Sequence, residues 1–192
     1  MSRIGILALQ GGFEAHRRSL ERLGRESSLV KTPEDLEGAD SLIIPGGEST
    51  VMIRLLKRLD LLEPLKERIR KGMPVFGTCA GMIMLSSGID GLEQETLGAM
   101  DFRVLRNAYG RQTESFEAEL EWEEGSGKEP PVPAVFIRAP MITGLGKDVD
   151  VLIRYEDHPV LVRQGHCLAA SFHPELTDSP VVHSYFLSEM AV

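Results

Sequence analysis

Residues 75–85 read VFGTCAGMIML, and they place Cys79 between Gly77 and Gly81 directly after a short apolar run. This G-x-C-x-G pattern is the cysteine form of a nucleophile elbow, a sharp turn from a strand into a helix where only glycines avoid clashes. A nucleophile at such a turn usually has a strained backbone, and the helix N-terminus behind it favours thiolate over thiol. The pattern therefore predicts a nucleophilic thiol, with a small buried cysteine at a strand end as the alternative.

His173 is the histidine whose surroundings best suit a base for this thiol. It follows a predicted buried strand in LAASFHPEL, so its side chain can project over the same sheet edge as Cys79. Glu175 comes two residues later, after Pro174, and a carboxylate there can hold the imidazole while the other ring nitrogen faces the thiol. The three residues thus predict a catalytic triad, with a surface His–Glu pair as the alternative. We expect no metal site, because no third ligand stands at a recognisable spacing.

The segment IIPGGEST, at the end of another predicted strand, offers the third element of such a site. Its consecutive glycines, Gly46 and Gly47, can turn a peptide N–H toward a developing oxyanion, together with the N–H of Ala80. An ordinary glycine turn before a helix, with Ser49 or Thr50 as the N-cap, is the alternative. No G-x-G-x-x-G follows the first strand and no G-x-x-x-x-G-K-[ST] occurs, so the sequence does not support nucleotide binding.

The first half of the chain alternates between apolar strands and amphipathic helices. Buried strands are predicted at residues 4–9, 27–31 and 74–78 and at the start of 41–50. This alternation favours a parallel sheet with helices on both faces. The second half contains short strands separated by turns, from which we expect a mixed or antiparallel extension of the sheet. A closing helix is predicted with Ser179 as N-cap and Pro180 at the first helical position.

Length and composition describe an ordinary globular chain. With 192 residues, one domain spanning residues 1–192 is expected. The formal net charge of -8 disfavours a nucleic-acid partner, because phosphate binding draws on clustered Lys and Arg. The acidic stretch at 121–133 carries no usable motif and is typical of a solvated loop.

Cysteine usage and hydropathy indicate a cytoplasmic chain with reduced thiols. The two cysteines, Cys79 and Cys167, form neither a C-x-x-C pair nor a disulfide framework, and Cys167 is expected to be a buried structural thiol. The N-terminus, MSRIGILALQGG, begins like a strand and turn, and not like a secretion signal. No apolar run approaches the roughly 18 residues that a membrane helix needs, so we expect no membrane association.

Three segments in this order, PGGEST, FGTCAGMI and SFHPEL, resemble the class I (triad) glutamine amidotransferases. More narrowly, LALQGG, RNAYGRQTESFEAEL and VFIRAP are similar to the glutaminase subunits of pyridoxal 5'-phosphate synthase, and the resemblance extends from about Ile4 to Leu187. It implies a three-layer α/β (flavodoxin-like) fold, in which a mostly parallel central sheet with an antiparallel extension carries helices on both faces.

The resemblance also implies roles for individual residues. Cys79 would be the nucleophile, His173 the general base and acid, and Glu175 the carboxylate that orients the histidine. Contacts with L-glutamine are implied at Gly47, Glu48, Ser49, Arg106, Ile137 and Arg138. Two of these positions are arginines, which agrees with the need to hold the carboxylate of free glutamine.

The implied activity is hydrolysis of L-glutamine to L-glutamate and ammonia, without a metal or an organic cofactor. The implied partner is a separate core subunit of pyridoxal 5'-phosphate synthase, which receives the ammonia within a large hetero-oligomer. Two alternatives remain open: a glutaminase that serves a different synthase, and a non-catalytic subunit that only binds glutamine. Another sequence in place of RNAYGRQ would indicate the first, and loss of the cysteine or the histidine would indicate the second.

Overall fold

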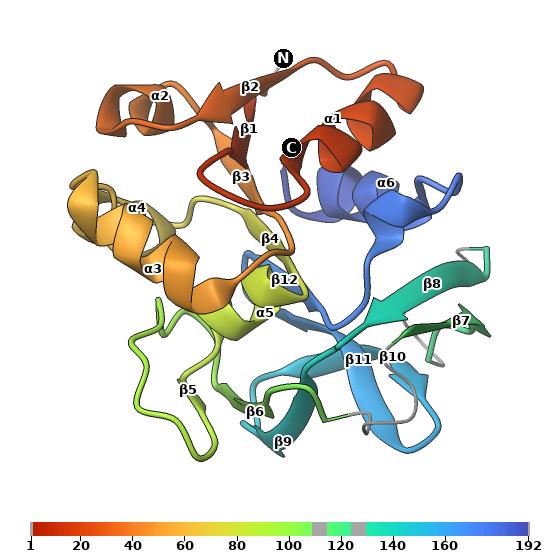
Figure 1. The fold of residues 1–192 in the computed structure, drawn as a ribbon. Coiled ribbons are helices and arrows are strands. Elements are labelled where there is room, and N and C mark those ends of the chain that lie inside the picture. Colours follow the sequence, from red (N-terminus) through yellow and green to blue (C-terminus); the bar gives the residue numbers. More distant parts are fainter. Residues whose placement is uncertain (1, 109–114, 124–129, 192) are drawn as a thin grey trace.

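A seven-stranded sheet forms the centre of the molecule (Figure 1). The computed structural model describes residues 2–108, 115–123 and 130–191, so that parts of RNAYGRQTESFEAEL and of the acidic stretch lie outside the described residues. In spatial order the strands are β10 (Asp150–Tyr155), β11 (His158–Gln164), β12 (Cys167–Ala170), β4 (Val75–Thr78), β3 (Ser41–Ile44), β1 (Ile4–Leu7) and β2 (Ser27–Val30). Neighbours from β12 to β2 run parallel, whereas β11 and β10 pair antiparallel at one edge.

Helices cover both faces of this sheet and complete three layers (Figure 1). One face carries α2 (Pro33–Glu37), α3 (Ser49–Arg58), α4 (Leu62–Arg70) and α5 (Ala80–Leu85), and the other carries α1 (Phe13–Arg22) and α6 (Val181–Glu189). Strands β1, β3, β4 and β12 are buried along their whole length. Burial on both faces explains why these strands consist almost entirely of apolar and small residues without alternation.

The carboxyl ends of the parallel strands gather three loops at one edge of the sheet. In the register of the sheet, Thr78 at the end of β4 lies opposite Ala170 of β12, and Gly77 lies opposite Ile44 of β3. The segments that follow these strands contain Cys79, the histidine of SFHPEL and the two glycines of PGGEST. The topology therefore brings the three predicted segments to one place, the edge where ligands bind in open parallel sheets.

The strands in the second half of the chain belong to three different sheets, which the sequence did not predict. Of the described strands in this half, β12 joins the parallel part of the central sheet, and only β10 and β11 extend it antiparallel. A separate three-stranded sheet contains β5 (Gly88–Ile89), β6 (Phe102–Leu105) and β9 (Met141–Leu145), and β7 (Ser115–Leu120) pairs with β8 (Val132–Ile137). The expected antiparallel extension is thus confirmed for two strands and wrong for β6, β7 and β8. Alternating patterns in β6 and β7 specify one buried face, but not the sheet that a strand joins.

Two predicted helix caps were also wrong. Helix α6 begins at Val181, and its N-cap is Pro180, not Ser179, with no side-chain hydrogen bond. At α3 the N-cap is Glu48, whose carboxylate accepts from the Thr50 N–H at 3.4 Å. Proline has no N–H to donate and a fixed φ. Pro180 can therefore stand at the N-cap of α6 as well as at the first helical position.

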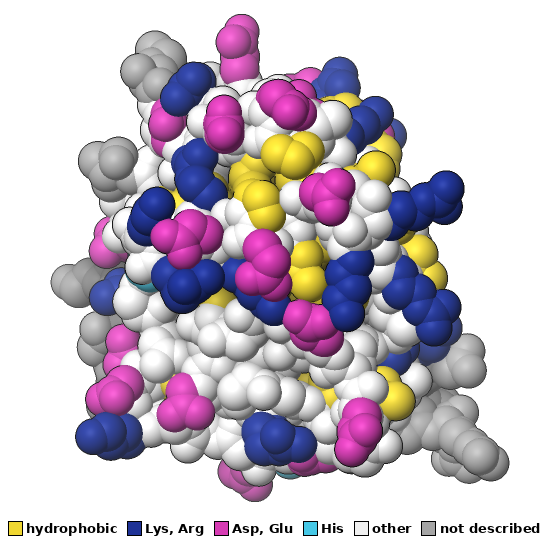
Figure 2. Space-filling view, turned by 90° about the vertical axis from the view of Figure 1, so that its left-hand side faces the viewer, with side chains coloured by type: hydrophobic (Ala, Val, Ile, Leu, Met, Phe, Trp, Pro, Cys, Tyr) yellow, Lys and Arg dark blue, Asp and Glu magenta, His cyan; other side chains and the backbone are white. Residues whose placement is uncertain are grey.

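The surface over α3 and α4 carries charges of both signs side by side (Figure 2). Lys66 of α4 pairs with Glu63 at 3.2 Å and with Glu95 at 2.6 Å, and Lys57 of α3 reaches the same Glu95 at 2.5 Å. These pairs link the two helices to the loop before β6. Among the helices within the described ranges, none is long and apolar enough to span a bilayer.

Candidate active site

Cys79 sits on a strained turn between β4 and α5. Its backbone has a φ of 49° and a ψ of -101°, values that a residue with a side chain rarely adopts. Its N–H donates to Ala170 O at 2.8 Å. A side chain at Gly81 would collide with the backbone of Ile44, and a Cβ at Gly77 would come within 2.6 Å of the Gly81 backbone. The G-x-C-x-G pattern therefore reflects close backbone approach, and this turn holds the thiol at the sheet edge.

His173 and Glu175 form a hydrogen-bonded pair beside this turn. His173 Nδ1 lies 2.8 Å from Glu175 Oε1, and the His173 N–H donates to Val135 O of β8 at 2.8 Å. Glu175 stands on a single 3-10 turn, Pro174–Leu176. Its side chain is 1% exposed and that of His173 is 13% exposed. The alternative of a surface His–Glu pair is therefore wrong.

Gly46 lies next to both the imidazole and the thiol-bearing residue. A Cβ built on Gly46 would collide with the ring of His173 and would lie 3.4 Å from the Cβ of Cys79. The thiol of Cys79 also contacts β8, because its Sγ lies 3.9 Å from the carbonyl oxygen of Ile137. The glycine turn thus leaves room for His173 to approach Cys79, and any larger residue would displace the imidazole.

Burial and mutual contact together determine the charges of the pair. Burial would lower the pKa of His173, but hydrogen bonds with Cys79 and Glu175 raise this pKa to about 10. Burial would raise the pKa of Glu175, yet His16 and His173 lower it to about 2. At neutral pH the imidazole is therefore positively charged and the carboxylate negatively charged. An imidazolium is the form that can protonate a leaving amine.

The glycine turn after β3 packs on the loop that follows β1. The Gly12 N–H donates to Gly46 O at 3.0 Å, and the Glu48 N–H donates to Gln10 Oε1 at 2.8 Å. Gly11 has a φ of 96°, and a side chain there would collide with Gly46 O. Gln10 belongs to the site although sequence reasoning gave it no role, because its partner lies 38 positions away.

Arg106 occupies the side of the site nearest α3. Its guanidinium donates to Glu48 Oε1 at 2.8 Å and to Thr50 Oγ1 at 3.3 Å. Thr50 Oγ1 in turn donates to Gln94 Oε1 at 2.7 Å. A carboxylate ligand can compete with Glu48 for the guanidinium, because both offer the same pair of acceptor oxygens.

One cavity of about 390 Å³ brings all of the predicted residues together. Its lining includes Gly46, Gly47, Glu48, Ser49, Cys79, Ala80, Arg106, Ile137, Arg138, His173 and Glu175. These residues come from loops that follow different strands, so the fold and not the local sequence places them together. The cavity combines a nucleophile, a charged acid and a guanidinium, the parts needed to bind and cleave an amide that carries a carboxylate.

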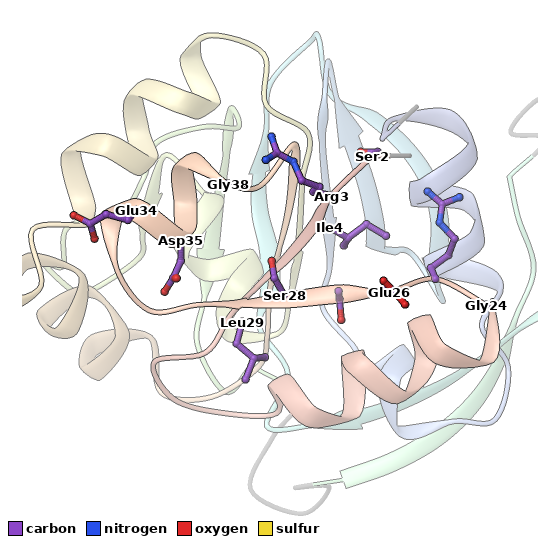
Figure 3. A pocket seen from close by; sticks show the side chains of 12 residues that line it. Ser2, Arg3, Ile4, Gly24, Glu26, Ser28, Leu29, Glu34, Asp35 and Gly38 are labelled. Atoms are coloured by element: carbon purple, nitrogen blue, oxygen red, sulfur yellow. The ribbon is translucent and has the colours of Figure 1, made fainter.

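A larger hollow of about 900 Å³ lies near the amino ends of β1 and β2 (Figure 3). The side chains around it include Arg3, Glu26, Glu34 and Asp35, and it contains none of the eleven residues predicted for the site. Because parallel strands present their amino and carboxyl ends on opposite edges, this hollow is remote from Cys79. The smaller cavity is therefore the candidate active site, because it is the one lined by residues that can act as nucleophile and acid.

Two further histidines lie buried behind Glu175. His16 of α1 and His183 of α6 are both fully buried, and His16 Nδ1 lies 2.9 Å from His183 Nε2. Burial lowers the pKa of both residues, that of His183 to about 3. The sequence gave no sign of this pair, because the two residues are 167 positions apart and neither belongs to a local motif.

Acidification is expected to destabilise the fold before most carboxylates titrate. In the unfolded chain His183 takes up a proton below about pH 6.5, whereas the folded residue stays neutral down to about pH 3. The unfolded state binds more protons in this window, so the free energy of unfolding should fall by about 1.4 kcal/mol for each pH unit. Denaturant titrations at several pH values between about pH 7 and pH 5 measure how steeply the free energy of unfolding depends on pH. His183→Leu should make this pH dependence of the free energy of unfolding shallower, and an unchanged pH dependence would contradict the prediction.

Known proteins resemble this chain over nearly its full length. The SNO glutamine amidotransferase family matches residues 6–192. Pyridoxal 5'-phosphate synthase subunit PdxT of Fervidobacterium nodosum is 53% identical over 184 residues, which cover 96% of this chain and 95% of that protein. The subunit of the same name from Thermosipho africanus is 50% identical over 186 residues, which cover 97% of each protein.

Solved structures agree with this sequence relationship. A crystal structure of a glutamine amidotransferase superposes with a TM-score of 0.90 at 50% identity and covers 96% of both chains. PurLQS from Thermotoga maritima, at 18% identity and a TM-score of 0.72, covers 97% of this chain and 98% of that chain, and it shares the fold alone. The predicted three-layer class I glutamine amidotransferase fold is confirmed. The chain belongs to the SNO glutamine amidotransferase family.

Proposed function

We propose that this chain hydrolyses L-glutamine to L-glutamate and ammonia, and that the ammonia is used to make pyridoxal 5'-phosphate. One observation carries the proposal: a thiol on a strained turn and a buried imidazole–carboxylate pair line one cavity in a member of a glutamine amidotransferase family. The destination of the ammonia is supported by relatives about half identical to this chain, which are subunits of pyridoxal 5'-phosphate synthase.

Cys79 acts as the nucleophile in the first half of the reaction. Its thiolate, formed as the thiol proton passes to His173, attacks the side-chain amide carbon of glutamine and forms a tetrahedral intermediate. The C–N bond of this intermediate breaks as His173 donates a proton to the departing ammonia. Glu175 stays ionised and holds the imidazole through Oε1. This half leaves a glutamyl thioester on Cys79.

Backbone N–H groups stabilise the oxygen that becomes negatively charged. Those near Gly46–Gly47 and at Ala80 are the proposed donors, and all three residues line the cavity. In the second half, His173 takes a proton from water, which attacks the thioester carbon. The same oxyanion forms and collapses, the C–S bond breaks and glutamate leaves, which restores the Cys79 thiolate beside a protonated His173.

The remaining cavity residues bind the amino-acid end of glutamine. Arg106 holds the α-carboxylate in place of its present partner Glu48, and backbone groups of the other predicted positions complete the contacts: Gly47, Glu48, Ser49, Ile137 and Arg138. Arg138 has a φ of 44°, a conformation that few residues with a side chain adopt. Such strain is often retained where a backbone group must face a ligand.

Arg106→Ala is expected to raise the KM for L-glutamine about 10- to 100-fold while kcat changes much less. The reason is that a charge-assisted contact to the α-carboxylate is made equally in the bound substrate and in the transition state. Steady-state glutamate release measures both constants. The matched control is Arg103→Ala, on β6 just before Arg106, whose partner Asp90 lies outside the cavity. An unchanged KM for Arg106→Ala would contradict the assignment.

The ammonia passes to a separate core subunit of pyridoxal 5'-phosphate synthase, in a large hetero-oligomer with this chain. Ammonia is mostly protonated at neutral pH and is then no nucleophile, so direct transfer through protein preserves its reactivity. We place residues 1–192 in the cytoplasm as a single glutamine amidotransferase domain that needs neither metal nor organic cofactor.

Docking of the core subunit is proposed to activate hydrolysis. The glycine turn is held by the Gly12 N–H on Gly46 O and by Gln10 on the Glu48 N–H. A partner that moves the loop at 10–12 would release these two bonds and redirect a peptide N–H of the turn toward the oxyanion. Hydrolysis would then depend on the presence of an ammonia user.

Ammonia release from L-glutamine, measured for the purified chain alone and with a pyridoxal 5'-phosphate synthase core subunit, tests the proposal. Release that rises on mixing supports both the activity and the partner. Strong and equal release in both cases keeps the hydrolysis and overturns the coupling. No release in either case, from a chain shown to be folded by circular dichroism, overturns the activity.

A further inference from the structure

Behind Glu175 lies a chain of buried polar side chains that the proposed reaction does not use. His16 Nε2 is 3.1 Å from Thr78 Oγ1 and 3.6 Å from Glu175 Oε2. His16 Nδ1 is 2.9 Å from His183 Nε2. Glu175 is 5% exposed, and the other three residues are 0% exposed. Buried polar groups in such a row restrict one another, because each can be satisfied only by its neighbours.

The position of the proton on His16 follows from the carboxylate beside it. Within the described parts of the chain, Glu175 Oε2 is buried and has no hydrogen-bond partner. A carboxylate only accepts, so an unprotonated Nε2 on His16 would set a lone pair against a negative charge. The proton therefore sits on Nε2, where it faces both Thr78 Oγ1 and Glu175 Oε2. At 3.6 Å the contact with Glu175 is electrostatic and slightly longer than a hydrogen bond.

The same reasoning fixes the tautomer of His183. With its proton on Nε2, His16 offers only a lone pair at Nδ1, so His183 must donate from its own Nε2–H. His183 Nδ1 is then unprotonated, and it is indeed buried without a hydrogen-bond partner among the described residues. Burial lowers the pKa of both histidines and keeps them neutral. The charged groups that act on the pair are Glu175, His173 and Arg22.

We infer that His16 is a positioning residue of the triad: its Nε2–H holds the second oxygen of Glu175, while His183 holds His16 in the required tautomer. The inference rests on the proposed glutaminase function. Glu175 stands on one short 3-10 turn, whereas His16 and His183 stand on α1 and α6. Two helices thus anchor a carboxylate whose own segment is short. Without that anchor the carboxylate can rotate, and His173 loses its orientation toward Cys79.

Thr78 connects this anchor to the nucleophile as well. It is the last residue of β4 and precedes Cys79, and its buried Oγ1 contacts the same His16 Nε2. The imidazole of His16 therefore contacts both the turn that carries the thiol and the carboxylate that orients the base. Phe76 of β4 packs edge-on against the rings of His16 and His183, at centroid distances of 6.2 and 5.7 Å, and fills the space around them.

A pair of amide substitutions separates this role from simple packing. In His16→Gln the side-chain amide can reach the position of Nε2 and donate to Glu175, whereas in His16→Asn it reaches only the position of Nδ1 and retains the contact with His183. We expect His16→Asn to lower kcat about 10- to 100-fold with little change in the KM for L-glutamine, and His16→Gln to recover most of the loss. Assays use the chain together with the synthase core subunit.

Leu20→Ala is the matched control for stability. Leu20 lies one turn further along α1, is fully buried and does not line the cavity, so its truncation should lower the melting temperature and leave kcat unchanged. Equal kcat values for His16→Gln and His16→Asn would overturn the inference. So would losses of kcat that follow the melting temperature across all three variants.

The tautomers give a readout that does not depend on activity. Long-range ¹H–¹⁵N correlation spectra of the wild-type chain distinguish a protonated from an unprotonated ring nitrogen. We expect Nε2–H tautomers for both His16 and His183, and an Nδ1–H tautomer of His16 would overturn the inference. A wild-type chain that releases no ammonia with the core subunit would instead overturn the proposed function, and the inference with it.

Discussion

Cys79→Ala is expected to abolish ammonia release from L-glutamine, with a loss of about 10⁴-fold or more in kcat. Covalent catalysis has no substitute here, because an alanine can form no thioester, and His173 and Glu175 by themselves only position a proton. The variant should remain folded, since Cys79 contributes its backbone to the turn, and its Sγ contacts Ile137 O at 3.9 Å and the imidazole of His173. It should also still bind glutamine, because the guanidinium of Arg106 is untouched.

Cys167→Ala is the matched control for that experiment. Cys167 is a fully buried thiol on β12, and burial raises its pKa to about 12, so it stays a protonated and unreactive side chain. Its removal should cost some stability and leave kcat unchanged. If Cys79→Ala retained activity, or if Cys167→Ala lost it without unfolding, the assignment of the nucleophile would be wrong.

Gly46→Ala should lower kcat about 100-fold while the protein stays folded. The added methyl group would occupy space taken by the imidazole of His173 and would come within 3.0 Å of its Nδ1. The ring must move away, which breaks its alignment with Cys79 and with Glu175. Displacements of about 1 Å in a catalytic group commonly cost about 10²-fold in rate. Steady-state kinetics together with thermal unfolding measure the two effects separately.

Gly144→Ala provides the control for adding a methyl group to a glycine. Gly144 lies on β9, away from the cavity, and a Cβ there would meet its nearest neighbour, the Cβ of Arg103, at 3.8 Å. That is an ordinary contact, so both activity and stability should remain near the wild-type values. A Gly46→Ala variant with wild-type kcat would show that His173 does not need the space beside this glycine.

The parallel part of the fold was predictable because the apolar composition of its strands is a strong indication of buried strands. β1, β3 and β4 are short apolar runs between turns, and burial on both faces requires that composition. The small sheets of the second half were not predictable to the same degree. β9 reads MITGL, with glycine inside the strand, and its partner β6 is distant in the sequence. Pairing between such strands is decided by tertiary contacts.

The residues of the candidate site likewise fall into those that a local sequence pattern predicts and those that it does not. Cys79 and its flanking glycines form a local constraint, so a local pattern identifies them. Arg106, Ile137 and Arg138 have no such pattern, and only the resemblance to a family singled them out. Neither route found Gln10 and His16, whose partners lie 38 and 167 positions away. Buried polar contacts between distant helices leave no periodic trace in a sequence.

Labelling with a chloroketone analogue of L-glutamine tests whether Cys79 is the nucleophile of a glutamine site, because the reagent needs both the site and a nucleophile. We expect one modified residue, Cys79, identified by peptide mapping, with labelling slowed by added glutamine and much slower in His173→Asn. The same treatment should leave Cys167 unmodified. Labelling at Cys167, or no glutamine-protected label on Cys79 in a chain that releases ammonia, would contradict this assignment.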